Sequence, residues 1–129
     1  AKSKGAKRAL PLPVSAPFHS SLLKPASDRL REYLAQVNFS APALQLINNV
    51  DVAIETDAAA IKDALVRQAA APVRWVESVQ KMSALGITRV IECGPGKVLS
   101  GLVKRIDTQL TADAINDQAS LEAVLEASQ

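Results

Sequence analysis

T-R-V-I-E-C-G-P-G, residues 88–96, predicts a strand that ends in a tight turn. The first six residues form a short, nearly continuous apolar run, which is typical of a buried strand in a parallel sheet. Gly94 and Gly96 can adopt the positive φ angles that a tight turn needs, and Pro95 fixes the turn. A helical pattern of apolar residues begins at Lys97. This window therefore predicts a strand–turn–helix unit.

Patterns of the same two kinds alternate along the rest of the chain. Helical spacing predicts helices over 19–37, from a cap at Thr56 or Asp57 to Pro72, from Pro72 to Gly86, and over 120–127. The buried stripe of the helix after Pro72 is expected to be Val73, Val76, Val79, Met82 and Leu85. An extended segment at 9–14 and strand-like runs at 43–50, 52–54 and 112–115 complete the pattern. This alternation predicts an α/β fold with a mainly parallel sheet.

Composition excludes several classes of function. The 129 residues suffice for one domain with a core, but the net charge is only +2, and few aromatic side chains are available to stack on bases. Nucleic acid is therefore not expected as a partner, and without a run of about 18 apolar residues neither is a membrane. The single cysteine excludes a disulfide framework and fits a reduced, cytoplasmic protein. The chain starts without Met, which suggests a piece of something longer.

The only histidine, His19, follows Pro17 in the stretch P-L-P-V-S-A-P-F-H-S-S at 11–21. Proline disfavours helical geometry in the residue before it, so His19 is expected to leave a sharp turn. Imidazole is the side chain whose ordinary pKa lies nearest neutrality, which makes a histidine beside two serines a candidate general base. A surface histidine without chemistry is the alternative that this window leaves open.

Other motifs give weaker signals. The G-P-G turn lacks the spacing of a nucleotide-binding loop, so a tight turn is the preferred interpretation. Cys93 could act as a nucleophile paired with His19, although cysteines in apolar strands are more often inert core residues. No cluster has metal-ligand spacing, so no metal is expected. Trp75 and Phe18 are interpreted as packing anchors.

Four blocks in order resemble the malonyl-CoA:acyl carrier protein transacylases, the acyltransferases of bacterial fatty acid biosynthesis. The blocks are L-P-V-S-A-P-F-H-S at 12–20, N-N-V-D at 48–51, L-V-R-Q at 65–68 with P-V-R-W at 72–75 and S-V at 78–79, and E-C-G-P-G-K-V-L at 92–99. The resemblance covers nearly the whole chain. It implies the C-terminal part of an α/β-hydrolase-like core at 14–129, preceded at 1–13 by the end of a ferredoxin-like inserted subdomain.

The resemblance also implies where the active serine lies. In this family the serine belongs to a G-H-S-x-G motif on the earlier part of the core, and the chain contains no such motif. The arginine that pairs with the malonyl carboxylate and the glutamine of the oxyanion hole are also missing. The resemblance therefore implies malonyl transfer through a Ser–His dyad whose serine lies outside this chain, and the chain alone is expected to be inactive.

Roles for residues in the chain follow from the same resemblance. His19 is the base of the dyad, and its imidazole is oriented through a main-chain carbonyl at Gln68. Phe18 and Val98 are expected to line the substrate pocket, and Phe18 would crowd an α-methyl group on the acyl chain. Asn48 and Asn49 are expected at the rim, and Cys93 is expected to be structural.

The resemblance implies substrates and partners, and no cofactor. The substrates are malonyl-CoA and a phosphopantetheinylated acyl carrier protein, and the missing N-terminal part of the same enzyme is a further partner. Because the carrier protein is acidic, a basic patch is expected to steer it, with Lys97, Lys104 and Arg105 as candidates. Three alternatives remain: a non-catalytic binding module, a thiol hydrolase that uses Cys93 and His19, and an acyltransferase domain of a polyketide synthase.

Overall fold

The computed structural model describes residues 1–11 and 13–128. Two 3₁₀ turns, Lys2–Lys4 and Ser21–Leu23, precede the first α-helix. The other elements are α1 (Lys24–Ala35), β1 (Leu46–Ile47), β2 (Ile54–Glu55), α2 (Ala58–Gln68), α3 (Trp75–Ala84), β3 (Arg89–Cys93), α4 (Val98–Ile106), β4 (Thr111–Ile115) and α5 (Gln118–Glu126). The fold thus has α/β content with a small parallel sheet.

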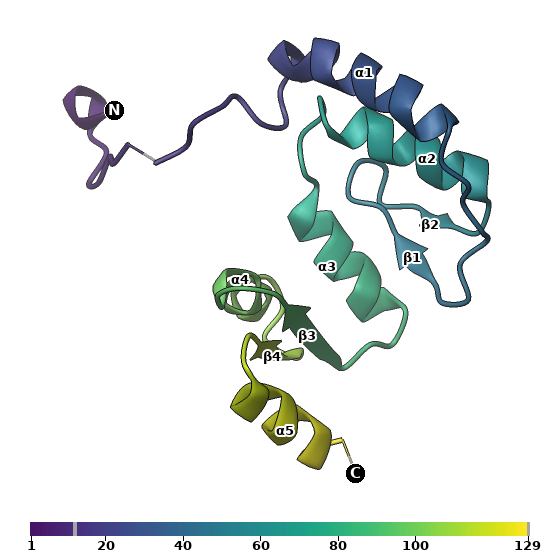
Figure 1. Ribbon diagram of the computed structural model, residues 1–129. Coiled ribbons are helices and arrows are strands. Elements are labelled where there is room, and N and C mark those ends of the chain that lie inside the picture. Colours follow the sequence, from purple (N-terminus) through teal and green to yellow (C-terminus); the bar gives the residue numbers. More distant parts are fainter. Residues whose placement is uncertain (12, 129) are drawn as a thin grey trace.

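Helices α1 and α2 lie side by side and form one end of the molecule with the β1–β2 pair (Figure 1). The two short strands run antiparallel, with Leu46 opposite Glu55 and Ile47 opposite Ile54. Asp57 caps α2, because its carboxylate accepts the Ala60 N–H at 2.8 Å. This end of the molecule carries the last turn of α2, which bears on the candidate site.

The other end is built on strands β3 and β4, which pair in parallel from Arg89 opposite Thr111 to Cys93 opposite Ile115. Helix α4 connects the two strands, and α5 packs beside β4 (Figure 1). Helix α3 lies between the two ends and packs on α4. The core here centres on the fully buried Val79 and Val103, with Leu110 and Ala112 beside them.

The predicted strand–turn–helix unit is confirmed, but the strand is not buried, because its residues are half-buried or exposed. Strand β3 covers Arg89–Cys93, and the turn after it places Gly94 at φ 153° and Gly96 at φ 105°. Helix α4 then begins at Val98, with Lys97 as its N-cap residue. The glycines supply the backbone angles that other residues rarely adopt, so this turn was predictable from residue types alone.

Several expected boundaries and burial patterns were wrong. Helix α3 begins at Trp75, so Pro72 and Val73 lie in the connection before it. Of the expected stripe, Val79 is buried, whereas Val76 is 52% exposed because only one side of α3 packs on the core. The first α-helix begins at Lys24, not at His19, after the 3₁₀ turn that follows Ser20.

The expectation of a mainly parallel sheet was also too simple. A short turn connects β1 to β2, and a parallel pair needs a crossover connection of about a dozen residues or more, so this pair runs antiparallel. The segment 9–14 forms no strand over its described residues, and Leu12 lies outside the described residues. Phe18 is exposed and is not the packing anchor that was expected.

Candidate functional site

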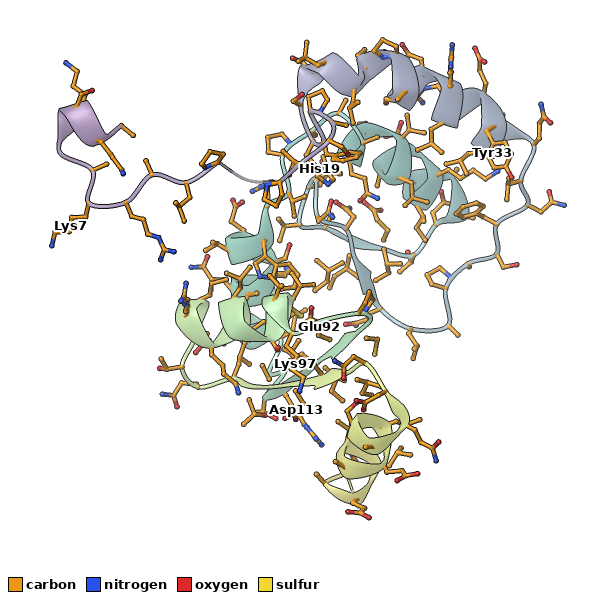
Figure 2. All side chains as sticks on the ribbon, turned by 60° about the vertical axis from the view of Figure 1, so that its left-hand side comes forward. Lys7, His19, Tyr33, Glu92, Lys97 and Asp113 are labelled. Carbon is orange, nitrogen blue, oxygen red and sulfur yellow. The ribbon has the colours of Figure 1, made fainter. Side chains whose placement is uncertain are left out.

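His19 lies at the tip of a tight turn ahead of α1 (Figure 2). The Phe18 N–H donates to the Ala16 carbonyl at 2.9 Å, and the Ser20 hydroxyl donates to the Pro17 carbonyl at 2.7 Å. His19 has φ 57°, a left-handed conformation that few non-glycine residues adopt. Proline and two local hydrogen bonds therefore impose the sharp turn that the sequence predicts, and the imidazole is exposed.

The His19 ring meets the C-terminal end of α2. Its Nδ1 lies 3.0 Å from the main-chain oxygen of Gln68, the last residue of that helix. A carbonyl oxygen can only accept a hydrogen bond, so this contact requires the proton on Nδ1. The same contact then leaves Nε2 with a free lone pair. The geometry provides an exposed imidazole with a defined tautomer and one nitrogen able to take a proton.

The last turn of α2 is tied to its neighbours by side chains. Ser27 of α1 is buried and donates its hydroxyl to the Val66 carbonyl at 2.7 Å. The Arg67 guanidinium forms two bonds to the Asp51 carboxylate, at 2.7 and 2.6 Å, and a third from Nε to Asp63 at 2.6 Å. The hydrogen bonds with Arg67 lower the pKa of both Asp51 and Asp63, and these carboxylates raise the pKa of Arg67 further above its usual range.

The turn between β1 and β2 is organised by Asn48, whose side chain is buried. Its Oδ1 accepts the N–H groups of Val50 and Asp51 at 3.2 and 2.7 Å, and its Nδ2 donates to Glu55 at 3.1 Å. Val52 is held at φ 60°, which is strained for a β-branched residue. Asn48 therefore organises the backbone of this turn through its side chain.

A cavity of about 460 Å³ lies between this turn and helices α2 and α3. Gln68, Asn49, Trp75 and Ser78 contribute to its walls, which are otherwise mostly apolar. Among the described residues, Asn49 Oδ1 and Trp75 Nε1 are buried side-chain atoms without a hydrogen-bond partner. Asn48 also lines this cavity with Asn49 and Gln68, and the expectation that both asparagines lie at a rim stays a prediction.

The predicted pocket residues Phe18 and Val98 are both exposed, and neither lines this cavity. Val98 begins α4, directly after the glycine turn. Glu92 lies beside this helix start, and its carboxylate accepts the Ser100 N–H at 2.9 Å, which lowers the pKa of Glu92. Val98 is therefore the first residue of α4, and its place in a substrate pocket with Phe18 stays a prediction.

Cys93 is exposed at the end of β3, so the expectation of a core position was wrong. Its thiol lies 4.0 Å from the Ile91 carbonyl, while the His19 ring contacts Gln68, so over the described residues no hydrogen bond joins the two candidates of a Cys–His pair. Over residues 1–11 and 13–128 no group of three potential metal ligands occurs.

Of the basic candidates, Lys97 lies below His19 in Figure 2, near Glu92 and Asp113. Lys97 and Lys104 line a cavity of about 410 Å³ together with Arg89 and Asp113, which form an ion pair at 2.9 Å. Arg105 follows in the last turn of α4. In the part of the chain that the structure describes, no helix has both the length and the apolar character needed to span a membrane.

No sequence pattern pointed to the contacts of Ser27 or Asp51. The Asp63–Arg67 pair has the four-residue spacing of helical ion pairs and could have been inferred. The Asp51–Arg67 contact spans 16 residues and that of Ser27 spans 39. Contacts over such separations depend on how the elements pack, and a local pattern does not record them.

Comparison with known proteins finds relatives over nearly the whole chain. The malonyl CoA-acyl carrier protein transacylase of Salmonella typhimurium is 58% identical over 124 residues, which are 96% of this chain and 40% of that protein. A crystal structure of an acyl-carrier-protein S-malonyltransferase from Burkholderia pseudomallei matches with a TM-score of 0.89 and 68% identity, over 97% of this chain and 41% of that one. No family model matches the chain.

A third match is a solved complex of a malonyl-transacylase with its type II polyketide synthase acyl carrier protein. Its TM-score is 0.91 and its identity 52%, over 98% of this chain and 41% of that one. The α/β content and the small parallel sheet agree with these structures. The chain spans about two fifths of the length of the curated relatives that it matches.

Proposed function

The chain belongs to the malonyl CoA-acyl carrier protein transacylase family, as the C-terminal part of such a protein, and we propose that it supplies the general base for malonyl transfer. In this proposal a malonyl group moves from coenzyme A to an acyl carrier protein in fatty acid biosynthesis. The single observation that carries the proposal is the 3.0 Å contact between His19 Nδ1 and the Gln68 carbonyl, because it leaves Nε2 free to accept a proton.

The proposed reaction has two halves, and His19 moves one proton in each step. In the first half, Nε2 takes the proton of a serine hydroxyl on the part of the enzyme outside this chain, and the serine oxygen attacks the malonyl thioester carbonyl. Nε2 then returns the proton to the departing coenzyme A thiolate. In the second half, Nε2 takes the proton of the carrier protein's phosphopantetheine thiol as it attacks the malonyl ester, and gives it to the departing serine oxygen.

Gln68 acts in this proposal through its main-chain oxygen, which orients the imidazole and fixes the tautomer. A neutral carbonyl does this without a second full charge beside the ring. Such a partner suits a base that must release its proton as readily as it takes it. We further propose that Phe18 and Val98 line the acyl pocket once the remaining part of the enzyme faces them, and that no cofactor is required.

Surface composition supports a larger fold around this chain. Seventeen large apolar side chains are exposed in the described residues, while nine apolar residues form the buried core. Exposed apolar surface on this scale is typical of a face that another part of a protein covers. We propose that the remainder of an α/β-hydrolase-like core covers it, with 14–129 as the C-terminal part of that core and 1–13 as the end of a ferredoxin-like inserted subdomain.

We also propose an acyl carrier protein as the macromolecular partner. A solved relative is a malonyl-transacylase in complex with a type II polyketide synthase acyl carrier protein, which supports this class of partner. Lys97, Lys104 and Arg105 are the proposed steering residues, because positive charge attracts an acidic carrier. The free thiol of Cys93 is in keeping with the reduced compartment proposed for the enzyme, the cytoplasm.

The test uses the intact enzyme that contains this chain, with His19→Ala and Cys93→Ser compared by single-turnover malonyl transfer. The proposal predicts that His19→Ala lowers the transfer rate by about 10²–10⁴-fold, the usual contribution of a general base. Cys93→Ser should transfer at the wild-type rate. Loss of transfer in both variants would favour a Cys–His thiol mechanism, and full transfer in both would favour a non-catalytic module.

A further inference from the structure

We propose that Asp51 and Arg67 form a positioning clamp that holds the Gln68 carbonyl against His19. The clamp is defined as the paired hydrogen bonds between the Arg67 guanidinium and the Asp51 carboxylate. This inference rests on the proposed function, in which His19 is the base. It adds two residues that act through the main chain of Gln68 and not on the substrate.

The carbonyl that meets His19 needs an external support. Gln68 is the last residue of α2, and the final four carbonyls of a helix lack the partners that hold the interior. Apart from the His19 contact, the Gln68 oxygen accepts one further hydrogen bond outside the regular helix ladder of the described residues. Its donor is the Ala71 N–H, at the long distance of 3.4 Å. Helix ends fray, so the position of this oxygen depends on whatever fixes the last turn.

Arg67 is the residue directly before Gln68, and its side chain is fixed at three points. Nη1 and Nη2 each donate to one carboxylate oxygen of Asp51, and Nε donates to Asp63, one helical turn earlier. A planar guanidinium bonded in this bidentate way has a defined orientation, not merely a nearby charge. The last turn of α2 is thereby connected to the turn between β1 and β2.

Asp51 provides a rigid anchor because its own backbone is held on both sides. Its N–H donates to the buried Asn48 side chain at 2.7 Å, and its carbonyl accepts from Arg74 at 3.2 Å. The Arg74 N–H in turn donates to the Asn49 carbonyl at 2.9 Å. The strained φ of Val52 persists only where surrounding contacts determine the backbone, which fits a turn that does not move.

Exposure separates a positioning role from a stabilising one. The side chains of Arg67 and Asp51 are 40% and 37% exposed, and exposed ion pairs contribute little to global stability. Small displacements of catalytic groups, in contrast, can reduce rates strongly. The clamp should therefore affect turnover far more than thermal stability.

The experiment compares Arg67→Lys and Asp51→Asn with Arg31→Gln in the intact enzyme, by steady-state malonyl transfer and thermal unfolding. Arg31 is a matched control, because it also forms an exposed ion pair with α2, to Asp63 at 3.3 Å, but does not touch Asp51. Arg67→Lys keeps the positive charge but loses the planar guanidinium that can donate two parallel hydrogen bonds to a carboxylate. We expect kcat to fall about tenfold in both clamp variants, a part of the ~10²–10⁴-fold contribution of a general base. KM for malonyl-CoA and the melting temperature should stay near those of the Arg31→Gln control.

Several results would overturn the clamp. Wild-type kcat in Arg67→Lys would show that charge alone suffices. An equal fall in kcat in Arg31→Gln would show a general effect of ion pairs on α2. If Arg67→Lys does not fold, the isosteric Asp51→Asn decides by the same measure. His19→Ala distinguishes failure of the clamp from failure of the proposed function. Full activity in His19→Ala would show that His19 is not the base.

Discussion

Ser27→Ala tests whether the last turn of α2 depends on a buried hydrogen bond. The Ser27 hydroxyl donates to the Val66 carbonyl at 2.7 Å, and the two residues are only 4% and 2% exposed. In a regular helix the Val66 carbonyl would accept from the Ala70 N–H, but that group donates to the Arg67 carbonyl at 3.2 Å. The Ser27 hydroxyl therefore takes the place of the Ala70 N–H as the donor to the Val66 carbonyl, at a buried position.

The size of the effect follows from that burial. Removing the hydroxyl leaves a buried carbonyl without its donor, which costs about 1–3 kcal/mol of unfolding free energy. Ser20→Ala is the matched control, because Ser20 also donates to a carbonyl at 2.7 Å, that of Pro17, but in an exposed local turn. A change there should stay within about 0.5 kcal/mol.

The assay is denaturant unfolding of the intact enzyme, with the midpoint and slope compared among the wild type, Ser27→Ala and Ser20→Ala. An unchanged slope would show that the denatured state is the same in all three. If Ser27→Ala were no less stable than Ser20→Ala, the carbonyl of Val66 would have another partner. The account of how α2 ends would then be wrong.

Three further outcomes are expected in the intact enzyme. The pKa of Glu92 is lowered, so its carboxylate stabilises the folded state fully above about pH 5. This stabilisation is lost as the pH falls through the pKa of Glu92 in the folded state. The difference in melting temperature between the wild type and Glu92→Gln should therefore become smaller from pH 7 to pH 3. Reversing the charges of Lys104 and Arg105 should raise KM for the carrier protein and flatten its salt dependence, and kinetics at two salt concentrations check this. Val79→Ala should lower the free energy of unfolding by about 2–3 kcal/mol, measured by denaturant unfolding. Val76→Ala should lower it by more than about 1 kcal/mol if the rest of the enzyme covers α3. A loss below about 0.5 kcal/mol would show that Val76 stays exposed in the intact enzyme.

The elements best predicted from sequence are those whose signal is local. The turn at Gly94 and Gly96 follows from residue types that tolerate positive φ, and Asp57 is recognisable as a helix cap. The stripe that includes Val76 was less predictable. Periodicity shows which residues share a helix face, but burial depends on which neighbour packs against that face.

The candidate site was only partly predictable for a related reason. Pro17 predicts that His19 leaves a sharp turn, which the structure confirms. The contact with Gln68 spans 49 residues and carries no local pattern; the family resemblance suggested it. Asp51 and Arg67 both lie in blocks that carry the resemblance, but their pairing was suggested by neither route, because it appears only when the turn after β1 and the end of α2 are placed together.

The placement of His19 at the end of α2 has an electrostatic consequence that a carboxylate partner would not share. The C-terminal end of a helix carries a partial negative charge, and its unpaired carbonyls point outward. In the proposed mechanism, Nε2 takes its proton while Nδ1 contacts this end of the helix. Because the partner remains neutral, the proton is not held by a full ion pair and can pass to the leaving group. A helix end anchored through Ser27, Arg67 and Asp51 therefore suits the role proposed for His19, a base that acts in both directions within one catalytic cycle.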